Sequence, residues 1–226
     1  MTFNDKPRLI IDYSNFEGIF EEPGIQLTKI IEKISEEFGI IIGLAPPFPF
    51  LVKFHDKFEI PFFSHLHYNT GTQKTYYHNS IEYLKALDIK GVIISDDKIP
   101  IIDLERYIRN SRTFRLYTLA YSHNVAISAA ISKFDPNAII FRTPENISKE
   151  TPLSKIPHEM IENHVKRVNI ENPKVSVFSG VRIHGKIDIE KGLEHQIEGY
   201  ILEIASALLR APHEFLVDIV KPLQNM

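Results

Sequence analysis

The sequence contains no cysteine, so it can build neither a disulfide framework nor a thiolate metal site. It has no stretch near the roughly 18 apolar residues that a membrane-spanning helix needs, and its first residues lack the apolar run of a signal peptide. A concentrated basic footprint is also missing, because the net charge is −3 and only Lys166, Arg167 and Lys174 lie near one another. We therefore expect a cytoplasmic protein with no membrane partner and no clear nucleic-acid signature.

The remaining composition is that of an ordinary globular protein. Hydrophobic residues make up 43% of the 226 residues and charged residues 24%, which leaves no room for a long disordered tail. A chain of this length can bury one full core. We expect a single domain over residues 1–226.

Short runs rich in Ile, Val and Phe recur along the whole chain without strict alternation of polar and apolar residues. Such runs are typical of strands that are covered on both faces, as in parallel sheets. The runs are residues 8–13, 39–44, 60–64, 91–94, 114–119, 138–141, 174–178 and 199–202.

The segments between these runs have the spacing of amphipathic helices. Residues 24–38 are the clearest case, with apolar residues at helical spacing on one side and Glu and Lys on the other. Pro23, Pro100 and Pro157 stand where three of the helices should start. Eight strand–helix units predict an α/β fold, a closed (β/α)8 barrel, with a doubly wound open sheet as the alternative.

A proline-rich run, APPFPFL at residues 45–51, directly follows the second strand. In this position it resembles the triosephosphate isomerase family in its short, archaeal form. Residues 124–136 keep the family's spacing after the fifth strand. Residues 143–145 and 151–155 are similar to the lid loop and the helix start that follows it, and residues 179–180 fall where the family binds phosphate. The resemblance covers nearly the whole chain and implies a TIM barrel.

The catalytic positions of that family carry other residues here. At the end of strand one, Asp12 stands in place of an asparagine and Ser14 in place of the substrate-binding lysine. Asp96 stands in place of the electrophilic histidine, where a carboxylate would repel a developing enediolate. Arg142 stands in place of the glutamate base, and an arginine stays protonated. We therefore predict a catalytically inactive homologue, with a binding, regulatory or structural role.

The phosphate site implied by the resemblance is altered as well. Gly180 is present, but Val181 and Arg182 follow it, and neither is a small residue that lets a phosphate approach the backbone closely. Glu203 brings a carboxylate near the phosphate position after strand eight, in a register uncertain by one or two residues. Residues 148–150 replace the glycine-bearing lid tip.

Charged residues of both signs should gather at the carboxyl ends of the strands, where barrels keep their sites. One expectation is that they pair and fill the old pocket, with Asp96 and Arg142 as the first couple. Another is an enzyme of a different class or a small-anion site, for which Arg142, Arg182, Gly180 and Lys98 are the candidate ligand-binding residues.

Metal chemistry is the weakest of the options. His65 and His67 could join Asp96 around a metal ion, but an isolated His-x-His spacing is a weak signal. We expect no metal and no cofactor.

The residues from 67 to 80 form the longest irregular stretch, and in the family the corresponding loop mediates subunit contacts. Here it carries Tyr68, Tyr76 and Tyr77, and aromatic residues of this kind are enriched at interfaces. We expect a homo-oligomer through this loop, while the sequence indicates no particular hetero-partner.

Overall fold

The computed structural model describes residues 6–14, 22–66, 81–95, 99–122, 124–204 and 206–225. These residues form an eight-stranded parallel sheet in the order β2-β1-β8-β7-β6-β5-β4-β3. A parallel bridge between Leu44 and Phe62 brings the two ends of the sheet together, so that the barrel is nearly closed. The strands are β1 (Leu9–Asp12), β2 (Ile42–Ala45), β3 (Phe63–Leu66), β4 (Gly91–Ile94), β5 (Tyr117–Ser122), β6 (Ala138–Phe141), β7 (Ser176–Ser179) and β8 (Gly199–Glu203).

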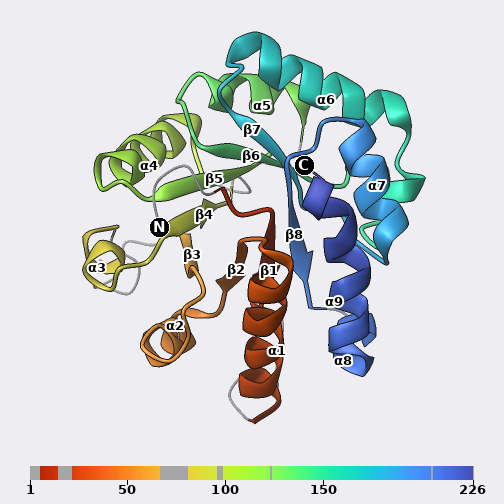
Figure 1. The fold of residues 1–226 in the computed structure, drawn as a ribbon. Coiled ribbons are helices and arrows are strands. Elements are labelled where there is room, and N and C mark those ends of the chain that lie inside the picture. The colour runs from red at the N-terminus through yellow and green to blue at the C-terminus, as the bar shows by residue number, and fades with distance from the viewer. Residues whose placement is uncertain are drawn as a thin grey trace.

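The helices surround the strands as an outer layer, and α1 and α9 lie side by side where the barrel returns to its first strand (Figure 1). This arrangement confirms the predicted (β/α)8 barrel, and the doubly wound open sheet was the wrong alternative. The helices are α1 (Glu22–Phe38), α2 (Phe48–Phe54), α3 (Ile81–Ala86), α4 (Ile101–Thr113), α5 (Val125–Ser132), α6 (His158–Glu171), α7 (Lys186–Glu194), α8 (Ser206–Arg210) and α9 (Pro212–Val220), with 3-10 turns at η2 (Leu153–Lys155) and η3 (Lys221–Asn225).

Prolines mark helix starts as the sequence predicted. Pro100 and Pro157 are the residues that directly precede α4 and α6, and Pro23 lies in the first turn of α1. Three strands, β2, β3 and β5, begin three residues later than predicted. β2 starts after Gly39, whose φ of 62° is a turn conformation. β3 starts after Pro61, which has no N–H to donate to a strand ladder, and β5 starts after Arg115, whose φ of 59° is a turn conformation.

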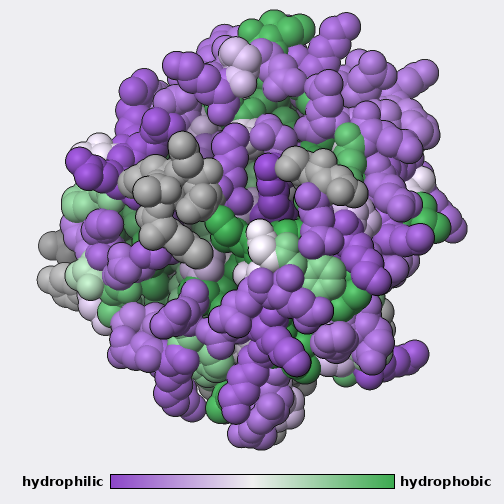
Figure 2. Space-filling model, in the orientation of Figure 1, coloured by the Kyte–Doolittle hydropathy of each residue, from purple (hydrophilic) through white to green (hydrophobic). Residues whose placement is uncertain are grey.

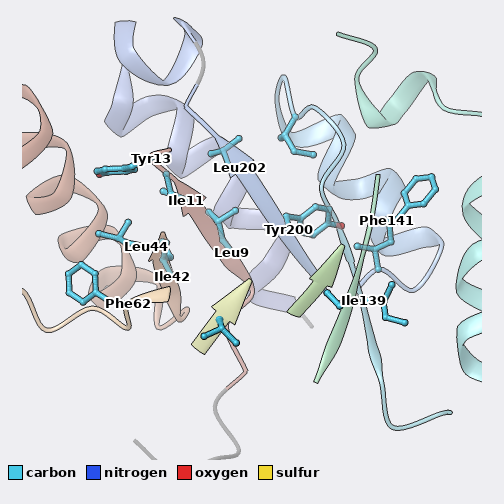
Figure 3. Packing of buried hydrophobic residues seen from close by; sticks show 14 of the residues in the cluster. Leu9, Ile11, Tyr13, Ile42, Leu44, Phe62, Ile139, Phe141, Tyr200 and Leu202 are labelled. Carbon is cyan, nitrogen blue, oxygen red and sulfur yellow. The ribbon is translucent and has the colours of Figure 1, made fainter. Parts of the chain in front are cut away.

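Buried side chains form two sets because successive residues of a strand point to opposite faces. Inside the barrel, Ile10, Phe63, Leu119 and Phe178 belong to one cluster. The second set packs between strands and helices. Figure 3 shows three of its members, Leu9 and Ile11 in β1 and Tyr13 directly after this strand. Ile10 and Asp12 therefore share the inner side, while the Tyr13 hydroxyl reaches Thr28 of α1 at 3.2 Å.

The face of the molecule in Figure 2 is largely hydrophilic, with hydrophobic residues visible in separate small areas. Individual large apolar side chains are exposed on helices, such as Ile102, Ile170 and Ile187. Across the described part of the chain, no helix combines the length and the apolar character needed to cross a membrane.

Candidate functional site

All eight strands run in parallel, so their carboxyl ends meet at one end of the barrel, which we call the mouth. Asp12, His65, Arg142 and Glu203 lie in or directly after the last residues of β1, β3, β6 and β8. The strand pairing places Asp12 opposite Glu203, so Glu203 ends β8 beside the end of β1. The side chain of Glu203 is exposed.

Asp12 and His65 form a pair across the mouth. His65 Nε2 lies 3.0 Å from Asp12 Oδ2, and Asp12 Oδ1 accepts the Ser14 amide at 2.9 Å. The Asp12 side chain is only 5% exposed and the His65 side chain 19%. Burial raises the pKa of Asp12, but the hydrogen bond and charge of His65 and the Ser14 amide together hold the pKa below the ordinary carboxyl value. Asp12 is therefore a buried, ionised carboxylate at neutral pH.

This pairing gives two of the sequence candidates a definite place. Asp12 is not a free acceptor in the mouth, because one oxygen faces the imidazole and the other a backbone amide. Ser14 is exposed and contributes its backbone, rather than a positive charge, to this corner. The metal site that the sequence suggested consists of His65, His67 and Asp96, of which His67 and Asp96 lie outside the described residues.

Arg142 follows β6 directly and turns back over the barrel interior. Its guanidinium carbon lies 4.2 Å from the centre of the Tyr121 ring, a cation–π geometry, and Nη2 lies 3.4 Å from the Ser95 hydroxyl. The predicted ion pair with Asp96 stays a prediction, because Asp96 lies outside the described residues, as does Lys98. The Arg142 guanidinium thus lies over the face of the Tyr121 ring.

The loop after β7 uses its first amides internally. The Gly180 N–H donates to the Phe141 carbonyl at 2.8 Å, and the Val181 N–H donates to the Ser179 hydroxyl at 3.2 Å. A β-carbon at Gly180 would lie 2.8 Å from Ile140 and 2.9 Å from Tyr121, so glycine is needed here for close packing. Gly180, a predicted ligand-binding residue, donates its amide to a neighbouring strand, and its part in ligand binding stays a prediction.

Arg182 connects the β7 loop with the loop that follows β6. Its Nη2 donates to both carboxylate oxygens of Glu150, each at 2.7 Å. The backbone is joined too, since Leu153 N–H donates to the Arg182 carbonyl at 3.0 Å and Pro152 forms a parallel bridge with Arg182. Sequence reasoning named Arg182 but missed Glu150, because partners 32 residues apart in two loops leave no periodic signal.

Asp188 of α7 anchors the same loop from the other side, and it too was missed. Its carboxylate accepts the Ser154 amide at 2.6 Å and the His184 amide at 2.7 Å. Lys191 donates to the Ser154 carbonyl at 3.0 Å, and burial lowers the pKa of its amine. The chain at residues 152–156 is therefore firmly held, while Glu150 stands at the solvent side of that anchor.

A pocket of about 260 Å³ lies between the ends of β6, β7 and β8. Tyr121, Gly180 and Ile201 are among its apolar and backbone lining, and its charged lining consists of Arg142, Lys149, Glu150, Arg182 and Glu203. The Arg182–Glu150 ion pair lies in this pocket, and whether Asp96 and Arg142 pair as predicted stays a prediction, because Asp96 lies outside the described residues. Among the described residues, the lining thus carries three cations and two anions, a balance that suits a small ligand with negative charge.

No group of three or more His, Asp or Glu side chains among the described residues could hold a metal ion. Tyr68, Tyr76 and Tyr77 lie outside those residues. The homo-oligomer through their loop stays a prediction that the oligomeric state in solution would test.

The chain is similar to curated proteins and to solved structures along most of its length. No protein-family model matches the chain. Curated relatives named triosephosphate isomerase include that of Methanocaldococcus jannaschii, 29% identical over 94% of this chain and 98% of the relative. That of Methanobrevibacter smithii is 27% identical over 96% of this chain and 99% of the relative. These similarities support a relationship with triosephosphate isomerases, as the sequence resemblance implied.

Solved structures agree on the fold. A thiamine phosphate pyrophosphorylase from Pyrococcus furiosus matches with a TM-score of 0.59 at 15% identity, covering 97% of this chain and 98% of the other. An N-acetylmannosamine-6-phosphate 2-epimerase from Clostridium perfringens matches with a TM-score of 0.63 at 12% identity, covering 93% and 91%. At such identities the match concerns the barrel and carries no site residue across.

Proposed function

We propose that this chain keeps the barrel of the triosephosphate isomerases without their chemistry, and works as a non-enzymatic binding, regulatory or structural module. The observation that carries the proposal is the placement of Arg142. At the end of β6, where the resemblance puts the glutamate base, a guanidinium lies over Tyr121. Arginine stays protonated in proteins, so it cannot take a proton from carbon.

Two further features of the mouth support the same conclusion. Asp12 and Ser14 replace the asparagine and the lysine of the family, and Asp12 engages His65. The Gly180 and Val181 amides donate to protein oxygens, so neither is available in this arrangement to a substrate phosphate. Loss of a base alone removes several orders of magnitude in rate, and the other changes act on separate parts of the barrier.

An isomerase assay tests the proposal directly. The purified protein is incubated with glyceraldehyde 3-phosphate, and the formation of dihydroxyacetone phosphate is followed beside buffer alone. The triosephosphate isomerase of Methanocaldococcus jannaschii is the positive control. We expect a rate equal to buffer. A rate well above buffer that also falls in an Arg142→Ala preparation, made in the same host, would overturn the proposal because a host contaminant would not respond to the substitution.

For the ligand of such a module, the pocket favours a small oxyanion. Arg142, Lys149 and Arg182 line a space of about 260 Å³, which is below the roughly 300–1,000 Å³ of pockets for drug-sized ligands. Guanidinium groups recognise carboxylate and phosphate without any turnover. Binding of inorganic phosphate, followed by calorimetry, is the direct measurement, and its absence at millimolar phosphate would remove this candidate.

A further inference from the structure

The Arg182–Glu150 contact occupies part of the pocket with a carboxylate that belongs to the chain itself. Both oxygens of Glu150 accept from one guanidinium nitrogen at 2.7 Å, and both residues line the pocket. An oxyanion is thus already bound to Arg182. A carboxylate or phosphate from solution would need the same guanidinium.

The two partners differ in how firmly they are held. The Arg182 side chain is 23% exposed and its backbone is joined to Pro152 and Leu153. The Glu150 side chain is 75% exposed and stands in a turn between β6 and η2. Exposed ion pairs contribute little to stability because water solvates both charges well. Glu150 is therefore the partner that can be exchanged.

Removing Glu150 from the pocket also changes the charge that a ligand meets. With the carboxylate in place, the charged lining consists of Arg142, Lys149 and Arg182 against Glu150 and Glu203. With Glu150 turned to solvent, Glu203 is the anion that remains among the described residues that line the pocket. The space then suits a doubly charged oxyanion better than a singly charged one.

We infer that Glu150 is an intramolecular competitor for the anion pocket, and that a small oxyanion binds Arg182 by displacing it. This inference rests on the proposed anion binding. Ligand binding should then release residues 148–151 from Arg182, while the anchor at residues 152–156 stays in place. The affinity of the pocket is lowered by the fraction of molecules in which Glu150 holds Arg182.

Calorimetric titration with inorganic phosphate tests the competition in four proteins: the native chain, Glu150→Gln, Glu145→Gln and Arg182→Gln. Glu145 is an exposed residue of the same loop that does not line the pocket, so its variant matches the change in net charge. We expect Glu150→Gln to bind phosphate about threefold to fivefold more tightly than Glu145→Gln, the factor that an exposed ion pair can supply. Arg182→Gln should lose binding.

Hydrogen exchange supplies the second measurement. The Glu150 and Thr151 amides donate to the Ser148 side chain and carbonyl at 3.3 and 2.9 Å. Phosphate should speed exchange at these amides in the native chain, and Glu150→Gln should show the faster exchange without phosphate. Equal phosphate affinity in Glu150→Gln and Glu145→Gln would overturn the competition and leave anion binding intact. No binding by any of the four proteins would overturn both.

Discussion

The two sides of the barrel mouth hold their charges in opposite ways. On the side of β1 and β3, Asp12 is buried against His65 and a backbone amide, and its carboxylate is 5% exposed. On the side of β6, β7 and β8, Arg182 meets Glu150, whose carboxylate is 75% exposed beside a pocket of about 260 Å³. The first pair is built into the framework, and the second stands where solvent or a ligand can compete. Two carboxylate contacts in one mouth can therefore have different roles, which burial decides.

The largest expected effect comes from breaking the buried pair. His65→Ala leaves the Asp12 carboxylate buried with one partner fewer, and we expect the free energy of unfolding to fall by about 3 kcal/mol. Denaturant unfolding at pH 7 measures this. Because Asp12 is ionised at that pH, the double variant Asp12→Asn, His65→Ala should recover part of the loss. If His65→Ala lost less free energy of unfolding than Arg182→Ala, the contrast between the two sides would be contradicted.

A second expectation concerns a buried histidine behind the pocket side. His164 of α6 packs edge-on against Phe141 and lies 2.9 Å from the Ser128 hydroxyl. Burial lowers the pKa of His164 to about 4. The unfolded chain binds this proton more readily, so the stabilising contribution is complete above about pH 6.5 and is lost as the pH falls toward 4.

The corresponding measurement is the free energy of unfolding across that pH window. The native chain should lose about 3 kcal/mol more than His164→Gln between pH 7 and pH 4. His184→Gln, at an exposed histidine, is the matched control and should follow the native chain. Parallel curves for the native chain and His164→Gln would show that His164 is not the group that titrates.

A third expectation concerns Asp12 and the free energy of unfolding at acidic pH. Its pKa is lowered in the folded chain, so its contribution is present above the unfolded carboxyl value and is lost as the pH falls through the lower folded value. Below pH 4 the native chain should therefore lose stability more steeply than Asp12→Asn. Equal slopes below pH 4 would mean that the Asp12–His65 contact does not favour the charged carboxylate.

The smallest expected effect lies on the exposed side. Glu150→Gln should change the free energy of unfolding by less than about 1 kcal/mol, because solvent screens the pair with Arg182. Thermal unfolding beside Glu145→Gln measures it. A loss comparable to that of His65→Ala would make Glu150 a structural residue of the barrel and remove the contrast.

Much of the barrel was predictable because it depends on local pattern. Apolar runs and helical spacing predicted the alternation of strands and helices, and Pro100 and Pro157 marked two starts correctly. The shifted starts of β3 and β5 were not predictable from apolar content alone, since Pro61 and the backbone turn at Arg115 decided them. For the site, the sequence predicted that charged residues lie at the strand ends, but it did not predict which of them are in contact.

By itself, the sequence determined that Asp12, Ser14 and Arg142 lie at or just after the ends of strands, and parallel strands bring such residues to one mouth of the barrel. Only the tertiary structure decided that Asp12 engages His65, 53 residues away, and that Arg182 holds Glu150, 32 residues away, at the edge of the pocket. Contacts of this kind depend on where loops and strands meet across the barrel, and no local preference of the chain encodes that distance.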